Sequence, residues 1–368
     1  MKDIINRIGS KNLIKLAIIL IVVVICIVGF SLIYYNFFYQ KSFEEIEAIM
    51  EQASKEYYSE NENKLPKVIG ESTEIDVNTL VNGDYMRSVA DYLKNEDIAC
   101  KASVRVTNVD NKYRFNPLLD CGRYHKYEFI SDYIKKHTTI VTERDGLYQV
   151  GENLLFRGEK INNYVSFAGS KWRIIRIENN KLILIYSGRL ERRIWDDRFN
   201  VERKGIYGIN NYSLSRIRDY LGNLYNGKSF MQTNDKLLLS NFTLQAGKVG
   251  ENDDDHSGDL AKSSPLSNQY IGLITVYDFM NASLDGSCKV ASNQSCSNYN
   301  YLADYDYSYW TLTGNKDTTH EVFVVSSEDG LFLKSASSNA FVRPVIAISD
   351  DAIYVSGNGT KKKPYVFK

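Results

Sequence analysis

One segment of this 368-residue chain matches a phosphate-binding pattern. Residues 222–229 read Gly-Asn-Leu-Tyr-Asn-Gly-Lys-Ser, which fits G-x-x-x-x-G-K-[ST]. In nucleotide-binding proteins a strand runs into this loop and a helix leaves it, so that backbone N–H groups surround the phosphates. Residues 273–278 resemble the strand ending in an acidic residue that accompanies this loop in nucleotide-binding proteins. However, apolar spacing in 213–224 predicts a helix before the motif, so we interpret the match as accidental and predict no nucleotide site.

A second chemically distinctive segment is acidic. It contains Glu251, Asp253, Asp254, Asp255, His256 and Asp259. Clustered carboxylates are ligands that Ca²⁺ prefers, but the spacing does not follow the register of an EF-hand loop. We predict a solvated loop and no cofactor, with a Ca²⁺ site at Asp253, Asp254 and Asp255 as the alternative.

A third segment, 299–310, is dense in aromatic residues with near-alternating spacing. They are Tyr299, Tyr301, Tyr305, Tyr307, Tyr309 and Trp310. Exposed aromatic side chains provide a large contact area for sugars or proteins at a low entropic cost. Alternation also allows half of them to face a core. We predict that some of these residues bind a ligand, and we expect a glycan or a surface protein.

The N-terminal region contains an uncharged and mostly apolar run over residues 16–40. About 20 apolar residues in a helix cross the hydrocarbon core of a bilayer. Lys2, Arg7, Lys11 and Lys15 precede this run, and acidic residues follow it. Because Lys and Arg stay on the cytoplasmic side, we predict a single-pass anchor at the cell membrane, with residues 1–15 cytoplasmic and the bulk extracellular. ATP is scarce there, which also weighs against a nucleotide site.

The five cysteines divide into Cys26, inside the apolar run, and two local pairs. An oxidising exterior permits disulfides. We therefore predict that Cys100 bonds to Cys121 and that Cys288 bonds to Cys296. Neither pair has the spacing or the neighbouring histidines of a zinc site.

Composition and motif content limit the remaining functions. Lys+Arg and Asp+Glu are balanced at 45 each. The chain therefore has no net positive charge that would attract nucleic acid. The chain contains neither H-E-x-x-H nor G-x-S-x-G, and its four histidines are scattered. We therefore predict no catalytic residues and consider an enzyme the less favoured class.

The periodicity beyond the apolar run predicts an α+β chain with two exported modules. Residues 41–137 contain a helical stalk at 42–58, a helix at 76–95 and a hairpin of 101–107 with 112–115 between Cys100 and Cys121. Residues 138–368 contain short strand patterns, including 138–142 and a hairpin of 171–177 with 181–186. Residues 245–268 have a loop-like composition.

The order of the later segments resembles a group of uncharacterised, membrane-anchored surface proteins of Gram-positive bacteria. Their C-terminal domain is similar to the C-type-lectin-like fold and to formylglycine-generating enzymes. The segments that carry this resemblance are 158–165, 172–175, 271–279, the Cys288 and Cys296 pair, 309–312, 342–346 and 357–365. Residues 42–130 more faintly resemble the globular part of pilin-like proteins.

The resemblance implies a compact domain of short strands and loops that presents a ligand-binding surface. The enzymes of this group rely on a cysteine pair, whereas Cys288 and Cys296 have no partner histidines nearby in sequence. We therefore expect a membrane-anchored extracellular binding or adhesion-type protein with a lectin-like head. The alternatives are a pilin-like or envelope-assembly subunit and an enzyme of the formylglycine-generating kind.

Overall fold

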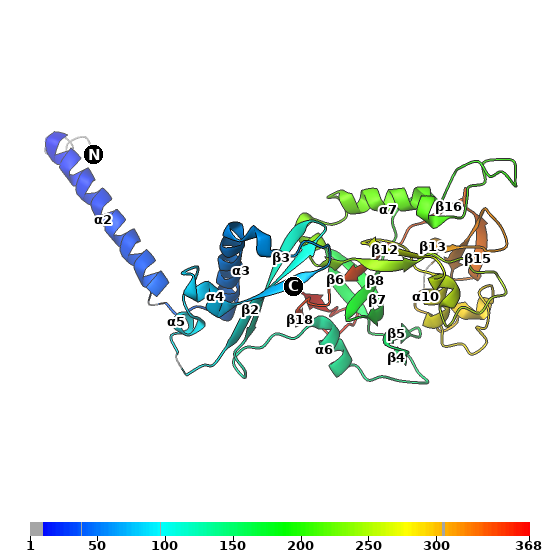
Figure 1. The fold of residues 1–368 in the computed structure, drawn as a ribbon, viewed down its shortest axis with the longest axis horizontal. Helices are drawn as coiled ribbons and strands as arrows, with labels where there is room; N and C mark the ends of the chain where they lie inside the picture. The colour runs from blue at the N-terminus through cyan, green and yellow to red at the C-terminus, as the bar shows by residue number, and fades with distance from the viewer. Residues whose placement is uncertain (1–9, 38, 96, 304–305) are drawn as a thin grey trace, which may run out of the picture. The chain divides into compact units, whose positions relative to one another are not determined.

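The computed structural model describes residues 10–37, 39–95, 97–303 and 306–368, and the side chains of all of these except 10–14, 32–33 and 35–37. Helices and mainly antiparallel sheets alternate along the chain, so the predicted α+β class is confirmed. The chain forms two compact units (Figure 1). Unit 1 comprises residues 1–65, 74–105 and 115–126. Unit 2 comprises 66–73, 106–114 and 127–368, so it contains the whole range of the predicted C-terminal module, 138–368.

Unit 1 begins with helices α2 (Ser10–Phe37) and α3 (Phe43–Glu60). Ser42 caps α3, because its hydroxyl accepts from the Glu45 amide at 3.2 Å and the Glu45 carboxylate accepts from the Ser42 amide at 2.8 Å. Ile46, Met50 and other apolar residues on one face of α3 are buried, which confirms the helix predicted at 42–58. The chain leaves helical geometry between the two helices, so α3 is not a continuation of α2.

Most of the described apolar side chains of α2 are exposed, including those of Leu16 and Phe30. Across the part of the chain whose side chains the structure describes, no helix is both long enough and apolar enough to cross a membrane.

The rest of unit 1 packs around the predicted disulfide-linked hairpin. The elements are η1 (Glu62–Lys64), β1 (Ser72–Asp76), α4 (Val77–Asn82), α5 (Val89–Leu93), β2 (Lys101–Val109) and β3 (Lys112–Asp120), and the strand order is β1-β2-β3. Asp110 and Asn111 connect β2 to β3 with φ of 52° and 61°, as in the tight turns that join twisted strands. The outer part of this hairpin, 106–114, belongs to unit 2. The single helix predicted at 76–95 is wrong, because Gly83 ends α4.

The larger sheet of unit 2 contains the hydrophobic centre. Its order is β10-β17-β8-β7-β5-β4, with β6 also paired to β7. The strands are β4 (Gly146–Val150), β5 (Asn153–Arg157), β6 (Tyr164–Phe167), β7 (Ser170–Glu178), β8 (Lys181–Tyr186), β10 (Leu239–Ser240) and β17 (Val345–Ile348). The predicted hairpin of 171–177 with 181–186 is confirmed as β7 and β8. The strand predicted at 138–142 is absent from these described residues, where Ile140 makes only an isolated bridge to Leu147.

A second sheet in unit 2 has the order β15-β14-β13-β16-β9. The strands are β9 (Arg192–Ile194), β13 (Tyr309–Gly314), β14 (Glu321–Ser326), β15 (Gly330–Ser335) and β16 (Asn339–Phe341). All six residues of β13 are buried. The three tryptophans, Trp172, Trp195 and Trp310, are fully buried in unit 2.

Short helices and two-stranded ribbons complete unit 2. The helices are α6 (Ile130–His137), η2 (Tyr212–Leu214), α7 (Arg216–Asn226), α8 (Thr233–Leu237), α9 (Asp259–Lys262), α10 (Val276–Ala282) and η3 (Gln294–Ser297). The ribbons are β11 (Phe242–Gln245) with β12 (Pro265–Gln269), and β18 (Tyr354–Ser356) with β19 (Val366–Phe367). Residues 245–268, predicted as a loop, therefore include α9 and most of β12.

Candidate ligand-binding groove

A polar groove of about 670 Å³ lies in unit 2 between helix α7 and residues 268–271 at the end of β12. Helix α7 contributes Arg218, Asp219, Gly222, Asn223, Tyr225 and Asn226, and the other wall consists of Asn268, Gln269, Tyr270 and Ile271. The side chains of Asp219, Asn223, Asn226 and Asn268 are exposed. The groove is therefore accessible and rich in side-chain amides.

The periodicity of α7 explains why these residues share one wall. Ser215 caps the helix by accepting from the Arg218 amide. Ile217 and Leu221, four residues apart, are buried. Arg218 and Gly222 follow each of them by one position and therefore lie on an adjacent face. The helix predicted at 213–224 is confirmed in its main part, although Leu214 lies in η2 and is exposed.

Two stacked tyrosines form the apolar part of the groove. The rings of Tyr225 and Tyr270 are 5.1 Å apart and inclined by only 7°. The hairpin residue Asp110 joins them, because its amide donates to the Tyr270 hydroxyl at 3.1 Å and its carboxylate accepts from the Tyr225 hydroxyl at 3.4 Å. Burial raises the pKa of Tyr270 to about 12 and also raises the pKa of Tyr225. Both hydroxyls therefore stay protonated at neutral pH, and their hydrogen bonds with Asp110 hold the stacked rings in place.

The lining residues suit binding better than catalysis. An Asn or Gln side chain both donates and accepts hydrogen bonds, and the groove combines four such amides with one guanidinium and one carboxylate. No Cys, His or Ser is among the described residues that line it, so this surface offers none of the usual nucleophile and base pairs. The chemistry that this lining supports is hydrogen bonding to a polar ligand.

The segment that matches the phosphate-binding pattern has a different geometry. Residues 222–226 are the C-terminal half of α7, and the Gly227 amide donates to the Asn223 carbonyl at 2.9 Å at the end of that helix. A helix therefore ends at this motif instead of beginning there. Residues 273–278 are not a strand either, because Thr275 caps α10 and Asp278 lies in its first turn.

Three of the six aromatic residues at 299–310 face the core, as their alternating spacing allowed, so they are not available to a ligand. Tyr301, Tyr309 and Trp310 are at most 1 % exposed. The Tyr309 hydroxyl donates to the Leu302 carbonyl at 2.8 Å, and the Trp310 ring nitrogen donates to the Arg193 carbonyl at 2.7 Å. The physical reason is that β13 lies between two other strands with both faces covered, so alternation along it does not produce an exposed face.

The other residues of that tract do not form one surface with the buried three. Tyr299 is 61 % exposed. Tyr307 is half-buried and packs against the Arg189 guanidinium at 4.6 Å. Tyr305 lies outside the described residues. A binding role for Tyr299 or Tyr307 stays a prediction.

The three aspartates proposed as Ca²⁺ ligands have separate partners. Asp253 pairs with Lys316 at 2.6 Å, Asp254 accepts from the His256 amide at 2.9 Å, and the buried Asp255 accepts from the Leu260 amide at 3.0 Å. Within the described residues, no group of three or more His, Cys, Asp or Glu side chains could hold a metal ion. The Ca²⁺ alternative therefore gains no support from the geometry.

Asp255 is expected to give unit 2 a pH-dependent stability. Burial raises its pKa to about 6, although the amides of Leu260 and Ala261 favour the charged form. This carboxyl binds its proton more tightly in the folded protein than in the unfolded chain, where its pKa is about 3.9. Its contribution to stability is therefore present at low pH and is lost as the pH rises from about 4 to about 6, on the order of 2 kcal/mol.

Urea unfolding of the full chain checks this expectation. The three tryptophans lie in unit 2, so their fluorescence follows the unfolding of that unit. Asp255→Asn should reduce the fall in unfolding free energy between about pH 4 and pH 7. An unchanged slope in this variant would show that Asp255 titrates normally.

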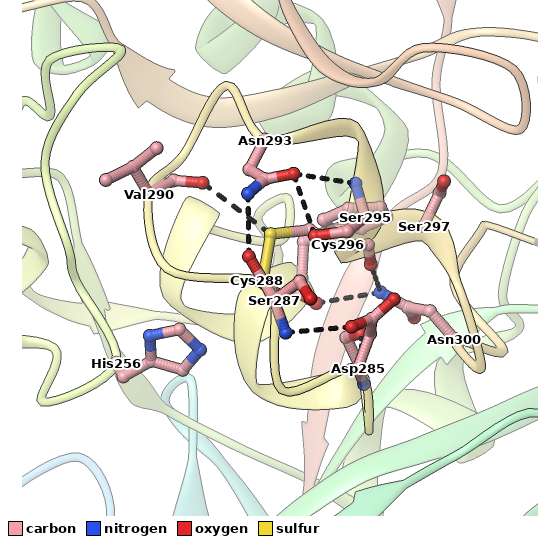
Figure 2. Close-up of a disulfide and its surroundings, with 12 residues drawn as sticks. His256, Asp285, Ser287, Cys288, Val290, Asn293, Ser295, Cys296, Ser297 and Asn300 are labelled. Carbon is pink, nitrogen blue, oxygen red and sulfur yellow. Dashed lines mark hydrogen bonds between the residues drawn. A yellow bond between two sulfur atoms is a disulfide. The ribbon is translucent and has the colours of Figure 1, made fainter.

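Both predicted disulfides are present. Cys100 bonds to Cys121 and Cys288 bonds to Cys296. In unit 2, Cys288 and Cys296 are buried, and Asn293 fixes the loop between them by accepting from the Ser295 amide at 2.9 Å and donating to the Ser287 carbonyl at 2.6 Å (Figure 2). In the described chain, Cys26 is the one free cysteine. The pair therefore has no thiol available as a nucleophile in this state.

The chain matches no family model, no curated protein and no solved structure.

Proposed function

We propose that this protein is a membrane-anchored extracellular binding protein whose unit 2 binds a glycan in the groove between α7 and β12. The amide-rich lining of that groove is the observation that carries the proposal. Asn223, Asn226 and Asn268 are exposed there beside Arg218 and Asp219. Such side chains can donate and accept at the same time, as neighbouring sugar hydroxyls require.

The shape and apolar wall of the groove support the same ligand class. Its volume of about 670 Å³ is within the range of small-ligand sites. The half-buried Tyr270, which stacks on the buried Tyr225, provides the aromatic surface for the C–H face of a sugar ring. The fixed helix and the fixed ring pair reduce the entropy lost on binding.

The membrane anchor is proposed from the N-terminal sequence. Residues 16–40 carry no charge, and the described apolar side chains of α2 between Leu16 and Phe30 are exposed. A bilayer would cover this surface, and the basic residues before it favour a cytoplasmic N-terminus. The segment order that resembles C-type-lectin-like surface proteins agrees with a ligand-binding head outside the cell.

The test is a binding screen of the full chain against an array of cell-wall and host oligosaccharides, followed by calorimetry on each positive glycan. Replacing both Asn223 and Asn226 by Ala should weaken binding by roughly fivefold for each amide lost. Asn162→Ala with Asn252→Ala is the matched control, because both residues are exposed in unit 2 and outside the groove. Absence of any glycan ligand, or equal binding by the two double variants, would contradict the proposal.

A second candidate function is a pilin-like or envelope-assembly subunit. The observation that favours it is the exposed apolar surface of α2, a helix of 28 residues that could pack against other copies. Crosslinking of the full chain in membranes separates the two candidates. A ladder of crosslinked copies favours assembly, and a strict monomer excludes it.

A further inference from the structure

The loop between β9 and α7 exposes large apolar side chains instead of burying them. In residues 198–206, named here the projecting loop, Phe199 is 58 % exposed, Val201 79 % and Ile206 69 %. The loop extends from unit 2 as the green segment beyond the end of α7 (Figure 1). Clustered apolar side chains of this size on a surface usually mark an interaction site.

Buried polar groups hold the projecting loop in one conformation. The Asn200 side-chain amide donates to the Gly208 carbonyl at 2.9 Å and to the Thr319 hydroxyl at 3.1 Å, and its oxygen accepts from the Arg203 amide at 3.0 Å. The fully buried Asp196 accepts from the Ile209 amide at 2.9 Å at the base of the loop. The apolar side chains are therefore held outward by a fixed backbone and cannot collapse onto unit 2.

Positive charge is interleaved with these apolar side chains. Arg203 and Lys204 are exposed at the loop tip, and neither occurs in an ion pair of the described residues. The Arg203 guanidinium lies over the Tyr207 ring at 5.1 Å. The one acidic residue at the tip, Glu202, accepts from the Thr319 hydroxyl at 2.8 Å. The tip therefore presents two cations without an ion-pair partner among three exposed apolar groups.

We propose that the projecting loop binds the surface of an anionic lipid bilayer. Phe199, Val201 and Ile206 enter the boundary between headgroups and acyl chains, while Arg203 and Lys204 contact anionic headgroups. A bilayer fits this loop better than a folded partner because the loop projects from unit 2 (Figure 1) and carries cations beside its apolar side chains, and a deformable anionic surface admits it without a matching pocket. This site is separate from the groove and does not rest on the proposed glycan function.

The test places a fluorescent reporter on the projecting loop itself. Helix α2 also exposes apolar side chains, so an assay of the whole chain would not distinguish binding by the loop from binding by α2. Full chain with Val201→Cys and Cys26→Ser is labelled with an environment-sensitive fluorophore and kept soluble with an uncharged amphipathic polymer. Phosphatidylcholine vesicles with or without phosphatidylglycerol are then added. We expect a blue shift, and quenching by brominated acyl chains, with the anionic vesicles only.

Two double variants of the labelled chain establish the role of charge. Arg203→Gln with Lys204→Gln should weaken partitioning by about fivefold for each cation. Lys361→Gln with Lys362→Gln, in another exposed loop of unit 2, should leave it unchanged. The proposal is overturned by an unshifted label on anionic vesicles or by equal shifts on both vesicle types. A lipid-independent shift that grows with protein concentration would instead identify a second copy of the chain as the occupant, and would also overturn it.

Discussion

Replacing Gly222 by Phe is expected to abolish glycan binding by the groove while unit 2 remains folded. Gly222 lies in the middle of α7 and lines the groove. A Cβ built at this position meets no atom within 4 Å, and no positive φ is required there. A large side chain can therefore extend into the groove, where it displaces the ligand without disturbing the core. Calorimetry with the glycan identified by the array measures the loss.

Two companion variants distinguish obstruction of the groove from damage to the helix. Gly222→Ala should raise the stability of unit 2 by roughly 0.5–1 kcal/mol, since Gly is a poor helix former, and should retain most of the binding. Arg216→Phe adds the same side chain at an exposed position of α7 outside the groove, so it should bind normally. Normal binding by Gly222→Phe would place the ligand elsewhere on the protein.

Asp278→Ala is expected to destabilise unit 2 by about 3–5 kcal/mol. The Asp278 carboxylate accepts from the Arg176 guanidinium at 2.5 Å, and both side chains are almost completely buried. Burial alone would lower the pKa of Arg176, but Asp278 and Glu178 raise it above its usual value, so the guanidinium stays charged. Removing Asp278 leaves that charge with only the partly exposed Glu178, and it also removes the cap that Asp278 forms with Thr275.

Urea unfolding followed by tryptophan fluorescence measures this loss. Asp197→Ala is the matched control, because its ion pair with Arg216 is half exposed and should contribute at most about 1 kcal/mol. Arg176→Met combined with Asp278→Leu should recover much of the stability, since no buried charge is then left unpaired. A loss below about 1 kcal/mol for Asp278→Ala would show that Glu178 alone compensates the guanidinium.

Several local features could be predicted from the sequence because they depend on neighbouring residues. The helix at 43–60 follows from a Ser-x-x-Glu cap and apolar spacing at Ile46 and Met50. The hairpin of β7 with β8 follows from two apolar runs separated by Asn179 and Asn180. Both disulfides connect cysteines that are close along the chain. In each case the determining contacts lie within about 20 residues.

The candidate groove was not predicted, although one signal for it was present. Gly222 lies in the middle of a helix whose apolar residues Ile217 and Leu221 are regularly spaced. A glycine lowers the stability of a helix interior, so its presence there is a signal that the space beside it is used. The opposite wall, at Asn268 and Tyr270, is more than 40 residues away along the chain. Periodicity within one helix cannot indicate which distant segment will pack beside it.

The sequence by itself determined the local elements, the two cysteine pairs and the unusual apolar N-terminal run. The tertiary structure decided which chemically distinctive residues remain accessible. In the folded chain Tyr301, Tyr309 and Trp310 lie in the core, and the segment that matches the phosphate-binding pattern lies at the C-terminal end of α7. The physical reason is that turns, caps and alternation arise from short-range sterics and hydrogen bonds, whereas burial depends on the strands and helices that cover each face after the chain has packed.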